Sequence, residues 1–480
     1  MSLRNIVISV ALLAFALSAP AQEDSGSVWN TKKSAWQQLT PAQRTQVSQF
    51  AESYKSYLDT ARTAQASTRE MIRQARDAGF AEFTSAAQVK SGAKLIFNNR
   101  DRAVILAVIG SEPLSAGSRV VAAHHDSPHL DLKARPIISR GSFVLLKTIY
   151  YGGIKKYQWA NIPLALIGRI DTTDGRSVNV SLGTKPGEPV FVIPDNAVHS
   201  DKPLRTRTYN DALLGEELNP VFGSVPGERS SAATEVLRQL SEAYKIKEED
   251  LVSAELQLVP AASPSDVGFD RGLIGAYGQD DRLSSYCAAR AIMEMKAIPR
   301  FTAMAYLTNF EEEGSVNNTG ASSAFLNNTF AQLTAAQRGQ HYTEFDLRTA
   351  LRNSRVISAD ANDGYNPIFG EATSESSNAA RLGYGVAIKA YGTGFNANSE
   401  YIAAIRGLLD GNQIPWQTQT PKVDIGGGGT IGGFLSRQDM EVIDLGVPLL
   451  SMHSPYEMSS KVDVWNFYRI MSAFYPWEGK

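Results

Sequence analysis

The sequence contains a single cysteine, Cys287, among 480 residues. A lone cysteine cannot form a disulfide within the chain, so core packing must hold the fold together, and a chain of this length can supply it. Cys287 lies in an apolar stretch at 283–295 without a nucleophile motif around it, which favours a buried core residue. The chain also has no marked excess of positive or negative charge, since it contains 47 Lys and Arg residues and 49 Asp and Glu residues. This balance argues against a nucleic-acid partner.

Long hydrophobic runs are absent beyond the first residues, so we expect no membrane span. At the N-terminus, Arg4 precedes an apolar run at 6–17, and Ala19-Pro20-Ala21 forms an A-x-A cleavage site. This pattern is typical of a secretory signal peptide over residues 1–21 and is too short for a membrane anchor. We therefore expect a periplasmic or secreted protein.

The pattern of predicted helices and strands changes twice along the chain. A long helical stretch is predicted from Thr40-Pro41 to about residue 78, followed by adjacent strands at 104–110 and 119–123. Residues 137–262 form short β-rich runs at 143–151, 178–182 and 190–193, with a charged helix near 232–244. From 263 onward, strand-like and helix-like segments alternate again. The simplest prediction is an α/β domain formed by 22–136 and 263–480, interrupted by a β-rich insertion at 137–262.

The segment VVAAHHDSP at 120–128 carries the clearest chemical signal. An apolar, strand-like run ends in His124 and Asp126, and ligands bind at the carboxyl edge of open α/β sheets. Similar runs are followed by other carboxylates and by a second histidine, namely Asp280, Glu311, Glu312, Asp360 and His453. Alone, a histidine at a strand end or an acidic turn at 311–313 indicates little. Together, two histidines and three carboxylates, one of them bridging, would give each of two metals three protein ligands and leave room for a water.

Six motifs resemble one known family. They are HHDSP (124–128), GQDDRLSSY (278–286), EEEGS (311–315), ISAD (357–360), GGTIGG (428–433) and SMHSPYEM (451–458). In this order and spacing they resemble the aspartyl aminopeptidase and aminopeptidase I family of zinc exopeptidases. YGGIKKYQW (151–159), AYGQDD (276–281) and the segment at 366–386 are most similar to the bacterial aminopeptidase I branch. The resemblance covers about residues 30–475.

The resemblance implies a role for each candidate residue. His124 and Asp360 would bind the first metal, Glu312 and His453 the second, and Asp280 would bridge the two. Asp126 would orient and polarise a ligand. Glu311 would be the general base that takes a proton from the bridging, metal-activated water and passes it to the leaving amine. Two zinc ions are expected, although the ligand types also suit manganese or cobalt.

The resemblance also implies a fold and an assembly. We expect a three-layer α/β/α sandwich around a mixed, mostly parallel sheet, with the insertion serving for dimerisation and covering the cleft. The function implied is a metal-dependent aminopeptidase that acts on peptides. A homo-oligomer is expected, either a dimer or a dodecamer.

Several positions depart from the family pattern. Asn362, Asp363 and Asn366 stand where the family's first branch has histidines, Tyr456 where arginine is expected, and Glu313 where an aliphatic residue is expected. None of them removes a predicted ligand. An acidic substrate side chain would need a cationic pocket, so these changes leave the substrate preference open. The resemblance to the bacterial aminopeptidase I branch implies neutral or hydrophobic N-terminal residues.

Other functions stay open from the sequence alone. They are an aminopeptidase specific for N-terminal Asp or Glu, a related metal-dependent deacylase, and a catalytically inactive homologue. His199, in the insertion, corresponds either to a family histidine that reaches a neighbouring subunit's active site or to a surface histidine.

Overall fold

The computed structural model describes residues 33–370, 378–391, 395–420, 422 and 428–479. The predicted signal peptide at 1–21 lies outside the described residues. Among the helices that are described, none combines the length and the apolar character needed to cross a bilayer.

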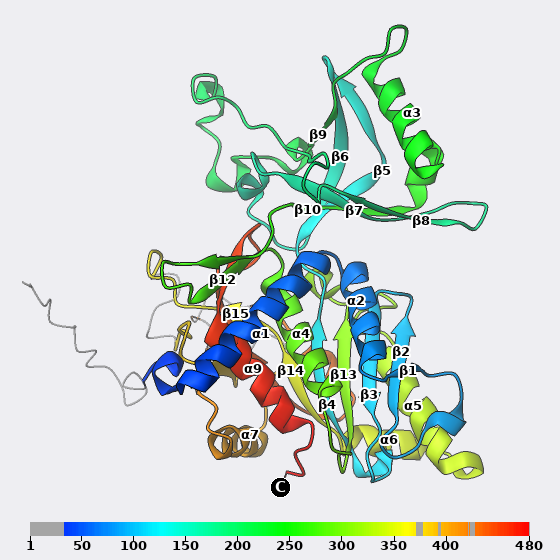
Figure 1. Ribbon diagram of the computed structural model, residues 1–480, viewed down its shortest axis with the longest axis vertical. Coiled ribbons are helices and arrows are strands. Elements are labelled where there is room, and N and C mark those ends of the chain that lie inside the picture. The colour runs from blue at the N-terminus through cyan, green and yellow to red at the C-terminus, as the bar shows by residue number, and fades with distance from the viewer. Residues whose placement is uncertain (1–32, 371–377, 392–394, 421, 423–427, 480) are drawn as a thin grey trace, which may run out of the picture. The chain divides into compact units, whose positions relative to one another are not determined.

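A nine-stranded sheet forms the centre of the described chain (Figure 1). Its four middle strands run parallel: β13 (Thr302–Thr308), β4 (Ser118–His124), β14 (Arg355–Ala359) and β18 (Glu441–Gly446). The flanking strands are β3 (Ala103–Val108), β2 (Lys94–Asn99) and β1 (Ala81–Glu82) on one side, and β16 (Val386–Lys389) and β17 (Trp416–Thr418) on the other. β3 and β16 pair antiparallel with the middle strands. The sheet is therefore mixed and mostly parallel, as expected.

One predicted pairing is wrong. The strands expected at 104–110 and 119–123 are β3 and β4, but β13 lies between them. β13 is antiparallel to β3 and parallel to β4. The connection between β3 and β4 thus passes over one strand position, which a distant segment fills, and no local pattern encodes such a long-range pairing.

Side chains alternate across the sheet and build a core on each face. On β4, Val121 and Ala123 belong to one core, whereas Val120 and Ala122 belong to the other. The first core is covered by α1 (Pro41–Thr60), α2 (Ala64–Asp77), α4 (Gln279–Met293), α7 (Ser399–Gly411) and α9 (Lys461–Phe474). The second is covered by α5 (Phe325–Arg338), α6 (Glu344–Arg352) and α8 (Gly432–Ser436). This is the expected α/β/α sandwich.

The helical stretch predicted to reach residue 78 is two helices. The Thr40 hydroxyl caps α1 by accepting from the Gln43 N–H, with Pro41 as the first helical residue. The chain leaves helical geometry at Ala61, and Thr63 caps α2 by accepting from the Ala66 N–H. A second capping threonine in the middle of the stretch is the signal that marks the break.

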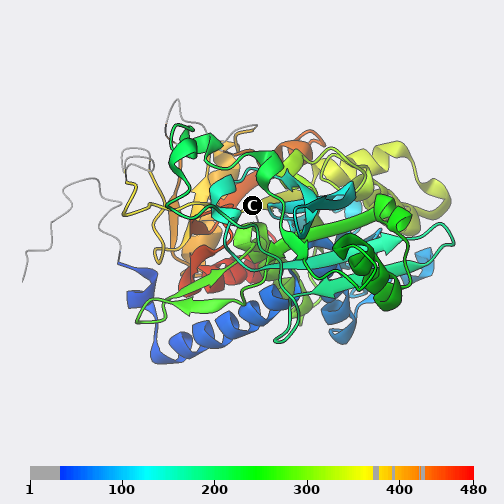
Figure 2. The same cartoon turned by 90° about the horizontal axis from the view of Figure 1, so that it is seen from above.

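A six-stranded antiparallel sheet follows β4 in the chain. It comprises β5 (His129–Arg140), β6 (Phe143–Tyr151), β7 (Leu164–Asp171), β8 (Ser177–Leu182), β9 (Val221–Gly223) and β10 (Ala254–Pro260). Helix α3 (Ala232–Tyr244) lies where the charged helix was predicted and packs on one face of this sheet (Figures 1 and 2). The run at 190–193 contributes only isolated bridges. The division of the chain at 137 and 262 stays a prediction.

A third sheet of five short strands was not anticipated. Its order is β11 (Ser265–Val267), β12 (Leu273–Ala276), β20 (Glu457–Ser460), β19 (Pro448–Leu450) and β15 (Asn362–Asp363). These strands have two to four residues each, too few for a clear alternation of apolar and polar side chains. The sheet matters because Asp280 follows β12 and His453 follows β19.

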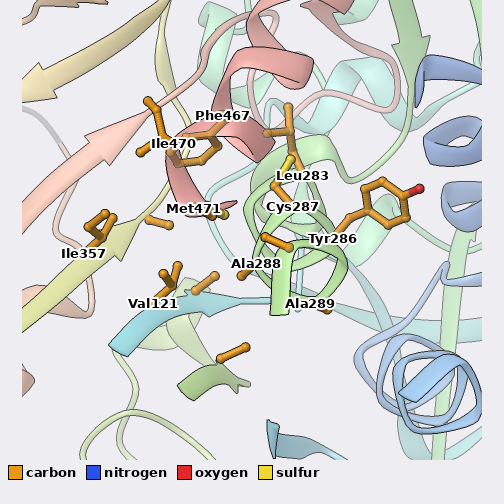
Figure 3. Close-up of a cluster of buried hydrophobic side chains, with 14 of the residues drawn as sticks. Val121, Leu283, Tyr286, Cys287, Ala288, Ala289, Ile357, Phe467, Ile470 and Met471 are labelled. Atoms are coloured by element: carbon orange, nitrogen blue, oxygen red, sulfur yellow. The ribbon is translucent and has the colours of Figure 1, made fainter. Parts of the chain in front are cut away.

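Cys287 lies in the core, as predicted. It is fully buried on α4, where it packs with Leu283 and with Phe467 of α9 (Figure 3). Its thiol donates to the Val464 carbonyl oxygen, at 3.5 Å. Burial raises the pKa of this thiol well above its ordinary value, so Cys287 is not a reactive nucleophile.

Candidate metal centre

The candidate residues reach one place from two sheets. His124 ends β4, Glu311 and Glu312 lie in a 3-10 turn (Glu311–Glu313) after β13, and Asp360 follows β14. The parallel register pairs Thr308 with His124, so these three strands deliver their polar ends to the same edge of the nine-stranded sheet. Asp280 and His453 enter from the five-stranded sheet instead. The strand endings predicted that all of these residues meet at one sheet edge. This prediction therefore holds for the residues of the nine-stranded sheet but not for Asp280 and His453.

The Asp280 carboxylate lies between the two imidazoles. Its Oδ1 is 3.6 Å from His124 Nε2, and its Oδ2 is 3.3 Å from His453 Nε2. His124 Nε2 is also 3.7 Å from Asp360 Oδ1, and His453 Nε2 is 3.3 Å from Glu312 Oε2. Each imidazole thus shares Asp280 and has one further carboxylate of its own.

The donor atoms fit divalent cations. Asp280 Oδ1 and Glu312 Oε1 are buried without a hydrogen-bond partner among the described residues. Buried carboxylate oxygens are costly to leave unpaired, and a cation is their natural counterpart. His124, Asp280 and Glu312 offer ligand atoms close enough together for one ion, and so do His124, Asp281 and Asp360. Imidazole nitrogens and carboxylate oxygens are the donor types that zinc takes in open catalytic sites.

Asp281 is a further carboxylate at this place, which the sequence did not single out. Its Oδ1 accepts hydrogen bonds from the Ser284 hydroxyl and from the Ala361 N–H, whereas Oδ2 has no partner among the described residues. We favour Asp280 as the shared ligand because its two oxygens face the two different imidazoles.

The Asp126 carboxylate ties three parts of the centre together. Its Oδ1 lies 3.3 Å from His124 Nδ1 and accepts from the Glu311 N–H at 3.2 Å. Its Oδ2 accepts from the Glu312 N–H at 3.2 Å and from the Tyr151 hydroxyl at 2.6 Å. Burial opposes ionisation of Asp126, but His124 and these donors outweigh it and lower its pKa to about 2. Asp126 therefore holds His124 and the Glu311–Glu312 backbone in one arrangement.

The pKa values of the carboxylates in the centre are shifted in opposite directions. Burial raises the pKa of Glu311 to about 8, with His124 opposing the shift and Asp360 adding to it. Burial and the neighbouring Asp280 also raise the pKa of Glu312. Burial works the same way on Asp280, but His124 and His453 outweigh it and hold its pKa below the ordinary value. Separated pKa values of this kind are typical of catalytic sites.

Comparison with known proteins gives the family. A family model described as "Aminopeptidase I zinc metalloprotease (M18)" matches residues 57–475. The chain belongs to the M18 aminopeptidase I family. A probable M18 family aminopeptidase 1 from Borrelia garinii is 38% identical over 92% of this chain and 99% of its own length. The family assignment makes the chain a hydrolase and a zinc metalloprotease of the aminopeptidase type.

Solved structures agree with the M18 fold. An M18-family aminopeptidase from Thermotoga maritima matches with a TM-score of 0.87 at 36% identity, over 92% of this chain and 98% of that one. Aminopeptidase I from Clostridium acetobutylicum gives 0.85 at 36% identity, with the same coverage. The S. cerevisiae mApe1 dodecamer matches at 20% identity with a TM-score of 0.71, over 88% of this chain and 96% of that one, which shows a shared fold.

Glu457 is a functional candidate that sequence reasoning missed. It is 1% exposed, and its Oε2 accepts from the N–H groups of Gln279 and Asp280, at 2.6 and 3.1 Å. Its Oε1 accepts from the His453 N–H at 2.8 Å. One carboxylate thus joins the two loops that carry Asp280 and His453. Its position inside the M18-like motif SMHSPYEM was the available signal.

Lys389 was also missed. Its ammonium group donates to the Asp360 and Ala361 carbonyl oxygens, at 3.1 and 3.3 Å, and lies 4.0 Å from Asp360 Oδ2. Burial opposes its charge, but Asp360 and other acids of the M18 centre outweigh this and raise the pKa of Lys389. The lysine therefore stays charged and fixes the Asp360 backbone.

The remaining histidines lie outside the ligand set. His125 is buried, with its Nε2 2.7 Å from the Arg102 carbonyl oxygen, which is a structural role. His129 stacks on Tyr151 with ring centroids 4.4 Å apart. His341 and His199 are exposed. A role for His199 in a neighbouring subunit stays a prediction.

Proposed function

We propose that this chain removes the N-terminal residue from peptides with two zinc ions. The observation that carries the proposal is the Asp280 carboxylate, whose two oxygens face the imidazoles of His124 and His453 within 3.6 Å. A carboxylate in that position suits a bridging ligand between two cations. The unpaired buried oxygens of Asp280 and Glu312 support the same assignment.

The ligands divide into two sets around Asp280. His124 and Asp360 would hold one ion, and Glu312 and His453 the other. When bound, the two ions would polarise the scissile carbonyl and lower the pKa of a water between them. Manganese or cobalt could replace zinc with the same ligand types.

Glu311 is the general base of this proposal. Its carboxylate lies 3.8 Å from His124 Nε2 and is 17% exposed, so a water in the cleft can reach it. Without metal ions, burial raises its pKa to about 8. Two nearby cations would lower this pKa towards the range in which a general base accepts and returns a proton near neutral pH. Glu311 would take the proton of the attacking water and deliver it to the leaving amine. The hydrogen bond that the Glu311 backbone N–H donates to Asp126 would keep Glu311 in place.

Acidic residues near the centre favour neutral or hydrophobic N-terminal residues. Asp363 lies in β15, three residues after the predicted ligand Asp360. Glu313 adds another acid, since its Oε1 accepts from the Gly152 N–H next to the centre. An acidic substrate side chain would face both groups. Specificity for N-terminal Asp or Glu is therefore the second-ranked substrate class.

A panel of aminoacyl chromogenic substrates with added zinc, manganese or cobalt tests the proposal. The panel runs beside Glu311→Gln and a control, Glu249→Gln, whose side chain is exposed and distant in sequence from the site. Glu311→Gln should lower kcat about 10²- to 10⁴-fold with metal content unchanged, and Glu249→Gln should match the parent. Fastest cleavage of Asp or Glu substrates would reverse the proposed preference.

Two further outcomes would replace the exopeptidase assignment. A free peptide and its N-acetylated form distinguish an aminopeptidase from a deacylase, because only the former needs the free amine. Cleavage of the blocked peptide alone indicates the deacylase. A chain that binds little metal and cleaves neither peptide is the inactive homologue.

We also propose a homo-oligomer, either a dimer or a dodecamer, in the periplasm or outside the cell. Exposed apolar side chains on the inserted sheet support assembly through it, namely Phe143, Ile149 and Tyr150 at 48%, 56% and 46% exposure. The leader at 1–21 supports export. Light scattering on the purified protein and fractionation of cells test the two statements separately.

A further inference from the structure

Three consecutive residues of the inserted sheet contact three different acids and bases of the centre. Tyr151 ends β6, and Gly152 and Gly153 follow it. The Tyr151 hydroxyl donates to Asp126 Oδ2 at 2.6 Å, and the Gly152 N–H donates to Glu313 Oε1 at 2.7 Å. The Gly153 carbonyl oxygen lies 2.9 Å from His453 Nδ1. The motif YGG therefore reaches both metal positions, a role that the proposed function leaves unassigned.

The Tyr151 side chain is held rigidly against Asp126. It is 8% exposed, and its ring stacks on His129 at an interplanar angle of 19°. It also meets the ring of Phe310, one residue before Glu311, edge-on with centroids 5.6 Å apart. A tyrosine held by two ring contacts can aim its hydroxyl at a carboxylate with little loss of side-chain entropy. Through Asp126, this hydroxyl acts on His124 and on the Glu311–Glu312 backbone.

Gly152 must be glycine at this place for two reasons. Its φ of 74° lies in the left-handed region, where other residues are strained. A Cβ here would also lie 3.1 Å from Pro128 Cγ and 3.2 Å from Glu312 Cβ, closer than ordinary contact. The backbone of the insertion therefore packs directly against a predicted ligand.

The Gly153 carbonyl determines which nitrogen of His453 faces the acids. A carbonyl oxygen only accepts, so the His453 ring must carry its proton on Nδ1 and donate it there. Nε2 is then left facing Asp280 and Glu312, each at 3.3 Å. Fixing the tautomer of a ligand in this way orients the ring and raises its basicity.

We propose that Tyr151, Gly152 and Gly153 are positioning residues of the metal centre. β6 and the two glycines that follow it would then supply the outer contacts that orient ligands of both ions. This inference rests on the proposed two-metal site. It assigns no proton transfer or substrate contact to the three residues.

Two variants with matched controls test the inference. Tyr151→Phe removes one hydroxyl, and its control, Tyr391→Phe, removes a hydroxyl from a tyrosine that is 63% exposed. Gly152→Ala adds a Cβ beside Glu312. Its control is Gly141→Ala, at a glycine with a φ of 59° and no atom within 4 Å of the added Cβ. Both glycines have a φ in the left-handed region, so the contact of the added Cβ is the main difference between the two variants.

The readouts are zinc affinity, measured by competition with a chelator, and kcat and KM. Tyr151→Phe and Gly152→Ala should each weaken zinc affinity about 10- to 100-fold, as loss of outer contacts to ligands does. With subsaturating zinc, kcat should fall and KM should change little, and excess zinc should restore part of the kcat lost in Tyr151→Phe. Both controls should stay within about twofold of the parent.

The inference is overturned if both variants bind zinc as tightly as their controls. It is also overturned if they lose activity only in proportion to a lower melting temperature. A parent chain that binds two zinc ions without cleaving any peptide would instead contradict the proposed function. The zinc affinities of the variants would still test the inference in that case.

Discussion

Glu457→Gln is the substitution that most directly probes how the two ligand loops are held. The Glu457 carboxylate accepts on both oxygens, from Gln279 and Asp280 on one and from His453 on the other. A glutamine has one accepting oxygen and one NH₂ group of nearly the same size. Whichever way the amide turns, its NH₂ faces a backbone N–H, so at least one buried donor loses its acceptor.

The expected magnitude follows from that lost contact. The amide oxygen should turn to the pair of N–H groups, which leaves the His453 N–H unpaired. A buried donor without its charged acceptor costs about 1–3 kcal/mol. The free energy of unfolding should fall by that amount in the metal-free protein, and zinc should bind about 10- to 100-fold more weakly at the site proposed to include His453.

Urea unfolding after chelator treatment and zinc competition measure the two effects. Glu249→Gln, at an exposed position, is the control for loss of one negative charge. If Glu457→Gln unfolds at the same urea concentration and binds two zinc ions as tightly as the control, the carboxylate does not join the two loops and the reasoning is wrong.

Three other outcomes are expected. Burial raises the pKa of Asp463 to about 7, against the N–H groups of Gly383 and Gly385, so the native state favours its protonated form. The stability of the parent relative to Asp463→Asn should therefore fall as the pH rises from 4 to 7, by up to about 4 kcal/mol in unfolding titrations, and be constant above pH 7. Chelation should lower the melting temperature, since the ions stabilise only the native state; readdition of zinc should reverse it in calorimetry. Cys287 should resist a thiol reagent until denaturant is added, and rapid labelling of the native protein would contradict its burial.

Elements with strong local signals could be predicted from the sequence. Helix α3 has the bounds predicted for it, because Ser231 caps it and its charged face is periodic. β6 also has its predicted bounds, and β8 begins one residue before the start predicted for it. In each case the apolar pattern, the cap or the flanking residues lie within the segment itself.

Elements that depend on distant partners could not be predicted in this way. β13 inserts between β3 and β4 although it lies almost two hundred positions further along the chain. The five-stranded sheet is built from runs of two to four residues, which carry no periodicity of their own. These pairings are decided by packing of the whole chain.

The candidate site also contains residues with a local sequence signal and residues that depend on distant contacts. His124, Glu311, Glu312 and Asp360 follow clear strand patterns, and the structure places them beside Asp280 and His453. Glu457 and Tyr151 act through backbone N–H groups and carboxylates of other segments, so no spacing within their own segments reveals them. Both residues lie in motifs that resemble the M18 family, but only the three-dimensional contacts connect them to the centre.

Because the proposed ligands come from two different sheets, folding should precede metal binding. No stretch shorter than 81 residues contains more than two of the five proposed ligands, so a partly folded chain offers an ion an incomplete set of ligands. Capture of both ions requires β4 to have paired with β13 and the loop after β19 to have docked. Metal uptake should therefore be among the last events of folding, and a radiolabelled or fluorescent ion would report the finished molecule rather than its intermediates.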